Sequence, residues 1–208
     1  MSTVTTITHA DDDAYSDMKL ISTSWTQNLS LSSAYWQELN GMTRGFDDTN
    51  RVGRSITMFK LAGAFSLLAT TSASVNILTG DCISVAIVYD KQVGNSAPSY
   101  AECFGGNDPL YTHGFRTDRY TILWHKIYAM QPLVTTTGNY TESGGNTTIV
   151  DSINLPLYNL RTDYNAGNTG LNDDMQYGCL YAVCYGRSLT GTTAFRITAR
   201  FVLAFDDA

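Results

Sequence analysis

The chain has 208 residues, a mass of 22.8 kDa and a formal net charge of −6 at pH 7. A negative net charge argues against a simple electrostatic nucleic-acid binder and against binding to an anionic membrane, because both depend on Lys and Arg. A folded chain of this mass buries about 70% of the surface of its unfolded state, so one β-rich domain with a sizeable core is expected.

The composition favours strands over helices. The sequence contains 27 Thr and 13 Tyr but only 4 Lys and 3 Glu. Thr and Tyr suit pleated strands, whereas Lys and Glu suit helices. Charged residues make up 15% of the chain, below the usual quarter. Such a surface suits contact with other protein, and the alternative is a secreted β-protein that is merely polar.

The elements are predicted in chain order from hydrophobic alternation and turn residues. Residues 1–17 are rich in Thr, Ser and Asp and are expected to form a flexible N-terminal arm, followed by one domain at 18–208. A short helical turn is expected at 35–39. The range 147–165 is expected to hold two strands around Pro156. Strands are predicted at 18–33, 54–68, 82–89, 119–129, 147–165, 176–186 and 194–205, and turn-rich loops at 41–50, 91–100, 135–146 and 165–174.

About eight strands in one domain predict an all-β fold, a single eight-stranded jelly-roll β-sandwich with long loops. The strand at 82–89 is apolar at every position, which indicates that the outer face of its sheet is also covered. The run 61–80 is uncharged but contains many Ser and Thr, so it is interpreted as a buried strand and a polar loop rather than a membrane span. The N-terminus lacks the cationic and apolar regions of a signal peptide.

The cysteines and histidines do not form a recognisable metal or catalytic pattern. Cys82, Cys103, Cys179 and Cys184 contain no CxxC pair and are expected to be buried free thiols in a reducing compartment. His125 alternates with Trp124 in a strand and is expected to be a satisfied core or interface residue. No nucleophile, zinc or phosphate-loop motif is present. We therefore expect no enzyme activity and no cofactor.

Four groups of aspartates are the remaining candidates for chemistry. Asp pairs in turns most often form Asx turns and keep a loop soluble. Two alternatives are calcium bound at an interface and paired carboxylates in catalysis. The groups are Asp11 to Asp13, Asp47 with Asp48, Asp173 with Asp174, and Asp206 with Asp207.

Basic residues are scarce, so their positions are informative. They are candidates for contact with nucleic acid or with a neighbouring subunit, and the alternative is pairing with loop aspartates of the same chain. Arg196 and Arg200 are an even number of residues apart, which places them on one face of a regular strand. The candidates are Arg44, Arg51, Arg54, Lys60, Arg116, Arg119, Arg196 and Arg200.

Three ordered motifs and the final strand carry a resemblance to a known family. Arg51-Val52-Gly53 precedes one strand, Val88-Tyr89-Asp90-Lys91-Gln92 ends an apolar strand before a turn with Asn95 and Pro98, and Arg119-Tyr120-Thr121-Ile122-Leu123 begins another. In this order, and with the closing strand FRITARFVLAFDDA, the chain resembles capsid proteins of circular Rep-encoding single-stranded DNA viruses, the circovirus- and geminivirus-like group.

The resemblance implies a structural capsid protein of the virion. It implies one jelly roll that self-associates into a small icosahedral shell of about sixty copies around circular single-stranded DNA. Assembly would take place in the host nucleus or cytoplasm, without a membrane, and a host receptor would be a further partner. The first 43 residues contain one base, Lys19, whereas such capsids usually begin with a long basic arm.

The alternative function is that of a carbohydrate-binding β-sandwich, because lectins also use jelly rolls. Such a module needs exposed aromatic residues in loops, next to Asp or Asn. Tyr111, Tyr140 and Asn139 are the candidates for this role.

Overall fold

The computed structural model describes residues 18–29, 33–70, 81–94, 96–108, 116–130, 136–137, 140–141, 147–167, 170, 172–188 and 194–207. The expected arm at 1–17 and the second half of the uncharged run, 71–80, lie outside these ranges. The elements in chain order are β1 (Lys19–Leu29), β2 (Tyr35–Glu38), β3 (Ser55–Thr70), β4 (Cys82–Asp90), α1 (Tyr100–Phe104), β5 (Tyr120–Ala129), β6 (Thr136–Thr137), β7 (Tyr140–Thr141), β8 (Thr147–Tyr164), the 3-10 helix η1 (Asn172–Asp174), β9 (Met175–Tyr177), β10 (Cys179–Arg187) and β11 (Ala194–Asp207).

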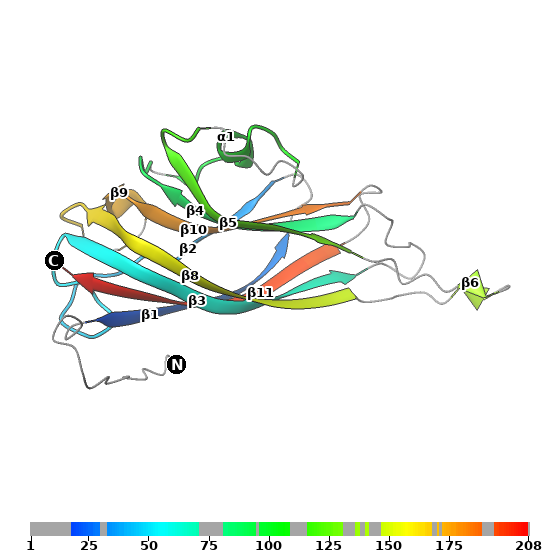
Figure 1. Ribbon diagram of the computed structural model, residues 1–208, viewed down its shortest axis with the longest axis horizontal. Coiled ribbons are helices and arrows are strands. Elements are labelled where there is room, and N and C mark those ends of the chain that lie inside the picture. The colour runs from blue at the N-terminus through cyan, green and yellow to red at the C-terminus, as the bar shows by residue number, and fades with distance from the viewer. Residues whose placement is uncertain are drawn as a thin grey trace.

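Eight principal strands form the two layers visible in Figure 1. Four antiparallel pairs, β1 with β11, β2 with β10, β3 with β8 and β4 with β5, are those of one long folded hairpin. Pairing of β11 with β3 and of β10 with β4 rolls this hairpin into two sheets. The sheet orders are β1-β11-β3-β8-β9 and β2-β10-β4-β5. This is the jelly-roll topology, and the predicted all-β sandwich is confirmed.

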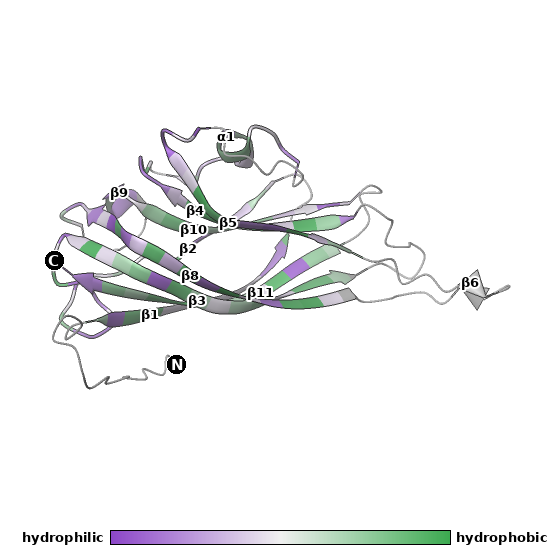
Figure 2. Ribbon diagram, viewed as in Figure 1, coloured by the Kyte–Doolittle hydropathy of each residue, from purple (hydrophilic) through white to green (hydrophobic). Residues whose placement is uncertain are grey.

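The core lies between the two sheets. Phe65 of β3 packs edge-on against Trp124 and Tyr128 of β5, with ring centroids 6.2 and 5.8 Å away, and thereby joins the layers. Along β11 the burial pattern alternates strictly from Ala194 to Phe201, with the apolar side chains inward. Figure 2 shows this alternation of hydropathy along the strands of the five-stranded sheet. Burial of each large side chain contributes about 1.5–3 kcal/mol.

The two central strands of the four-stranded sheet, β10 and β4, are buried on both faces. Every residue of β4 is buried, and so are the first eight of β10. The segment that holds α1 covers the outer face of this sheet. The ring centroids of Tyr100 and Tyr185 are 4.9 Å apart, and those of Phe104 and His125 are 5.2 Å apart. The expectation of a covered outer face is therefore correct. The five-stranded sheet has no such cover among the described residues, and its outer face is the open one.

Three elements differ from the sequence predictions. Residues 35–38 form β2 instead of a helical turn, because they pair with β10 from Tyr35↔Cys184 to Glu38↔Tyr181. The range 147–165 holds one strand, β8, rather than two. Pro156 is tolerated there because β9 pairs only with Asp163 and Tyr164, which leaves β8 as an edge strand at the proline. The helix α1 was not predicted.

Close approach between β3 and β11 requires a glycine. A Cβ on Gly63 would lie 2.4 Å from the Arg200 carbonyl oxygen and 2.5 Å from the Phe201 ring. No helix in the described part of the chain is long and apolar enough to cross a membrane.

Candidate interaction surfaces

Arg51 is buried instead of lying on the surface. Its side chain is 0% exposed, and its guanidinium lies 4.1 Å from the centre of the Tyr164 ring. Nη1 and Nη2 donate to the carbonyl oxygens of Gly53 and Gly167 at 2.7 and 2.9 Å. Burial lowers the pKa of Arg51, although Tyr164 opposes this shift. In the isolated chain, Arg51 therefore links two loops and offers no surface to a ligand.

Arg119 and Arg116 pair with carboxylates of the same chain. Arg119 holds Asp90 through two bonds, Nε to Oδ1 at 2.9 Å and Nη2 to Oδ2 at 3.0 Å, and also reaches Glu102. The hydrogen bonds to Asp90 raise the pKa of Arg119. Arg116 lies 3.3 Å from Asp118 and 3.8 Å from Glu102. Intrachain pairing, the alternative considered for these bases, is what the structure shows for both of them.

Arg44 and Arg54 belong to the loop between β2 and β3. Both are exposed, and Arg44 Nε donates to the carbonyl oxygen of Val52 at 3.3 Å. Neither forms an ion pair with any residue that the structure describes. They lie at the end of the sandwich where β3 starts, away from the middle of either sheet.

Lys60, Arg196 and Arg200 share the open face of the five-stranded sheet. All three are exposed, and the predicted common face of Arg196 and Arg200 is confirmed. Lys60 of β3 pairs with Ala204 of β11, so the three cations occupy positions equivalent to 196, 200 and 204. These positions are four residues apart, about 13 Å along a strand. The cations therefore form an evenly spaced line.

No carboxylate among the described residues interrupts this line. The outward positions of β1, β3 and β8 beside it are hydroxyl, amide, apolar or proline side chains. Asp151 of β8 points the other way, toward β5, where it accepts hydrogen bonds from Lys126 and Tyr128. None of the three cations forms an ion pair with a described residue, and among the described residues Arg200 Nε donates a hydrogen bond to Ser22 Oγ at 3.3 Å.

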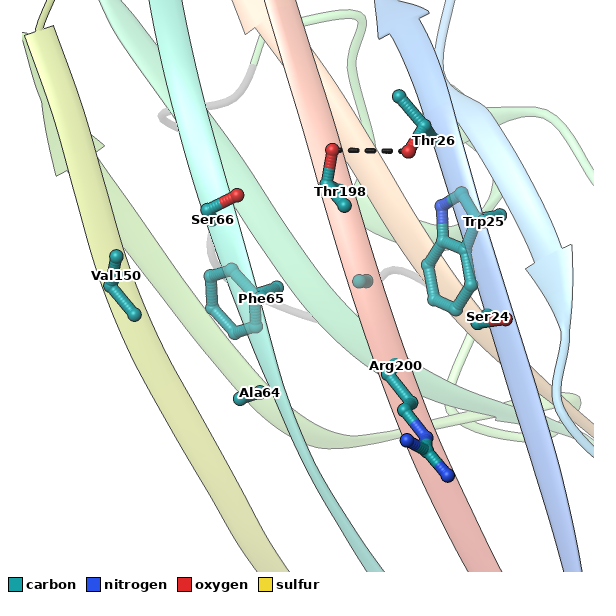
Figure 3. Close-up of a pocket in the computed structure, with 10 residues that line it drawn as sticks. Ser24, Trp25, Thr26, Ala64, Phe65, Ser66, Val150, Thr198 and Arg200 are labelled. Carbon is teal, nitrogen blue, oxygen red and sulfur yellow. Dashed lines mark hydrogen bonds between the residues drawn. The ribbon is translucent and has the colours of Figure 1, made fainter. Parts of the chain in front are cut away.

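A shallow hollow of about 600 Å³ lies beside Arg200 on the same face. Figure 3 shows hydroxyl side chains and Arg200 on this side of the ribbons, with the rings of Trp25 and Phe65 behind them. Thr26 and Thr198 share a hydrogen bond of 3.1 Å. The hollow therefore offers hydroxyl groups and one guanidinium next to the apolar side chains of Ala64 and Val150, with the two aromatic rings on the core side of the sheet. Its hydroxyl-bearing residues are Ser24, Thr26, Ser66 and Thr198.

The aspartate groups mostly make local contacts. Asp47 accepts from the Asn50 amide at 3.3 Å, as expected of a turn residue, and Asp174 accepts from the Gly170 N–H at 3.0 Å. Asp206 and Asp207 end β11 instead of lying in a free tail, and Asp207 binds Lys19 at 3.1 Å. Within the described ranges no three His, Cys, Asp or Glu residues lie close enough to hold a metal ion. Asp11 to Asp13 are outside these ranges.

The cysteines are free and buried, as predicted. His125 is hydrogen-bonded to Ser84, with Nε2 2.7 Å from Oγ, and Tyr100 lies 3.2 Å from the same Ser84 oxygen. Ser84 is 1% exposed beneath α1. The Ser84–His125 contact is therefore a packed structural contact, in agreement with the sequence interpretation of His125.

Exposed apolar side chains gather at one end of the sandwich. Strand directions place the start of β1, the loop between β2 and β3, the end of β8 and β9 at this end. Phe46 is 94% exposed and Tyr158 is 85% exposed. Five of the six exposed large hydrophobic residues lie here or in the adjoining part of β8; we name them the apolar end: Met18, Phe46, Val52, Tyr158 and Tyr177.

Sequence reasoning missed the hydroxyl groups of the hollow and the exposed aromatics of the apolar end. Alternation would have placed Ser24 and Thr26 outward on β1, but their position beside Arg200 depends on the register between β1 and β11. Tyr111 and Asn139, proposed for carbohydrate binding, lie outside the described residues, and the side chain of Tyr140 is also undescribed.

Comparisons with known proteins give distant likenesses. No protein-family model and no curated protein sequence matches the chain. A solved chain of Desmodium yellow mottle tymovirus shares 10% identity over 98% of this chain and 94% of its own, with a TM-score of 0.26. A chain of the infectious bursal disease virus VP2 subviral particle shares 6% identity over 92% of this chain and 38% of its own, with a TM-score of 0.27. A chain of the T13 particle of that virus shares 8% identity over 90% of this chain and 39% of its own, with a TM-score of 0.22. These values are too low to support a functional argument.

Proposed function

We propose that this chain is a structural coat protein that self-assembles into an icosahedral viral shell and catalyses no reaction. The observation that carries the proposal is the apolar end. Large apolar side chains exposed at the same end of a subunit mark a site of protein contact, because leaving them in water forgoes the free energy of their burial. The occupant we assign to it is another copy of the chain.

The high Tyr content and the low Glu and total charged content support the same proposal. Interface cores are enriched in Tyr, Trp, Phe and Arg and depleted in Lys and Glu. This chain has 13 Tyr and 3 Glu, and a charged fraction of 15%. Repeated weak contacts between copies close into a shell when their symmetry closes. A jelly roll, with its loops at two ends and compact layers between, is a subunit shape used for this purpose in viral capsids.

The finer part of the proposal comes from the sequence resemblance. The ordered motifs at Arg51-Val52-Gly53, Val88 to Gln92 and Arg119 to Leu123 support a shell of about sixty copies around circular single-stranded DNA. The place of the chain would then be the virion. Because the chain has a net charge of −6, a packaged genome needs a local basic surface.

Light scattering coupled to size exclusion tests the proposal. We expect a particle of many copies, with a 260/280 nm absorbance ratio that reports whether nucleic acid is enclosed. A monomer at every protein concentration and salt concentration contradicts self-assembly. Removal of calcium with a chelator is expected to leave the mass unchanged, because the described aspartates make local contacts.

A matched pair of variants locates the contact. Phe46→Ser, in the apolar end, is expected to reduce the assembled fraction at least tenfold, whereas Val150→Ser on the sheet face is expected to leave it unchanged. Both remove a large side chain that is mostly exposed, 94% for Phe46 and 73% for Val150. Equal effects of the two variants would place the contact elsewhere.

A further inference from the structure

We propose that the open face of the five-stranded sheet binds the phosphate backbone of a single-stranded nucleic acid, with the hollow beside Arg200 as a phosphate subsite. The inference deepens the proposed coat function, on which it rests for its biological setting. Its observations are independent of the apolar end. They are the line of Lys60, Arg196 and Arg200, the hydroxyl groups beside these cations, and the lack of carboxylates at the described outward positions between Arg196 and Lys60; Asp206 of β11 lies on the same face beyond the Lys60 end of the line.

Charge distribution is the first step of the argument. All thirteen Lys and Arg residues are described, and six of them form ion pairs with carboxylates: Lys19, Arg116, Arg119, Lys126, Arg161 and Arg187. Lys60, Arg196 and Arg200 instead lie together on one face and form no ion pair with a described residue; the nearest outward carboxylate along β11 is Asp206, two residues beyond the position opposite Lys60. On a chain with a net charge of −6, this face is complementary to an anion.

Spacing is the second step. The three cations recur every four residues along the strand direction, so the line spans about 27 Å. A compact anion would touch one of these cations. An extended polyanion that runs along β11 would contact all three in turn. The repeated charge therefore fits a chain of phosphates better than a single small ligand.

The chemistry between the cations is the third step. Thr26, Thr198 and Ser66 form the one outward row of the sheet between Arg196 and Arg200, and Ser24 lies directly opposite Arg200. Hydroxyl and guanidinium groups are common donors to phosphate oxygens in protein–nucleic acid complexes. Trp25 and Phe65 line the hollow, but their rings pack against Phe201 on the core side of the sheet, so the described outer face offers no aromatic platform there on which a base or a sugar could stack. Binding is therefore expected to be independent of base sequence.

The test measures binding of fluorescein-labelled (dT)30 by anisotropy across a salt series, below the concentration at which light scattering detects assembly. Three phosphate contacts predict a slope of log K against log salt of about −2, from about −0.7 per contact on a single strand. The variant Arg196→Ser/Arg200→Ser is expected to bind roughly 25-fold more weakly at 0.1 M salt, with a slope of about −0.7. (dC)30 is expected to bind as (dT)30 does.

A charge-matched control separates the face from general electrostatics. Arg44→Ser/Arg54→Ser removes two exposed arginines that also lack a described acidic partner, but that lie in the loop between β2 and β3. We expect wild-type affinity and slope from it. Equal loss in the two double variants overturns the proposal, and so does tight binding of dextran sulfate with no binding of (dT)30, which would indicate a sulfated glycan instead.

Light scattering of the same variants distinguishes failure of this inference from failure of the coat function. Arg196→Ser/Arg200→Ser is expected to assemble as wild type does and to lose only oligonucleotide binding. Assembly that fails in this variant but not in the control assigns the face to contact between copies and overturns the inference. A wild-type chain that binds (dT)30 through this face but never assembles supports the inference and contradicts the coat function.

Discussion

Arg119 holds both carboxylate oxygens of Asp90, at 2.9 and 3.0 Å, at the point where β4 ends and β5 begins. Asp90 is 1% exposed, and its Oδ1 also accepts the Gln92 N–H at 2.9 Å. Both Asp90 and Arg119 belong to the motifs that carry the sequence resemblance. The pair closes the base of the segment that holds α1, and this segment covers the outer face of the four-stranded sheet.

Asp90→Asn is expected to lower the free energy of unfolding by about 3 kcal/mol, because it leaves a partly buried guanidinium without its bidentate partner. Urea unfolding followed by tryptophan fluorescence measures the change, and limited proteolysis should show faster cleavage within 91–119. Asp118→Asn removes the exposed partner of Arg116 and is expected to change neither measurement. Equal stability of the Asp90→Asn variant and the wild type would contradict the closing role of the pair.

Arg51 provides a second stability prediction. Arg51→Met would leave the carbonyl oxygens of Gly53 and Gly167 without their donors in a buried site, at a cost of about 3 kcal/mol. Since Arg51 has no exposed surface in the chain, oligonucleotide binding by the folded variant should match that of wild type. Urea unfolding and anisotropy with (dT)30 measure the two quantities. Weaker binding with unchanged stability would show Arg51 to be a surface contact after all.

The long strands could be predicted because their patterns are local. Alternation along β11 put Arg196 and Arg200 on one face, and continuous apolarity along β4 indicated a covered sheet. The exceptions depend on distant partners. Residues 35–38 become β2 through pairing with β10, about 145 residues away, and the five-residue helix α1 is too short for its periodicity to be read.

The sequence identified the basic residues that are candidates for the site, but it could not predict where the fold places each of them. Sequence alone treated Arg51 and Arg200 alike, although one is buried against Tyr164 and the other lies on an open sheet. Lys60 joins the line of cations because of a register shift between Met58 and Lys60, which no local pattern reveals. The register also decides that hydroxyl groups of β1 and β3 lie beside Arg200.

The ionised Asp151 carboxylate is expected to account for part of the loss of folding stability at low pH. Hydrogen bonds from Lys126 and Tyr128, at 2.6 and 2.7 Å, lower the pKa of Asp151 to about 2. A depressed folded-state pKa stabilises the fold above the unfolded value of about 4, and this contribution is lost as the pH falls toward 2. We expect the stability difference between wild type and Asp151→Asn, measured by urea unfolding, to be constant from pH 5 to 7 and to shrink below about pH 4. A difference that persists at pH 2 would contradict this assignment.

The bulge of β8 supplies a prediction about backbone conformation. Tyr158 and Asn159 have φ values of 49° and 63°, the left-handed region, and three β8 residues lie opposite Phe59 between the pairs Met58↔Leu160 and Lys60↔Pro156. A β-branched residue is strained there, so Tyr158→Val is expected to lower the free energy of unfolding by about 1–2 kcal/mol. Tyr158→Asn tolerates the same backbone and should have a stability close to wild type. Both variants remove the same exposed ring, so the difference between them in urea unfolding of the unassembled chain reports the backbone alone. Equal stability of the two variants would mean that residue 158 leaves the left-handed region in solution.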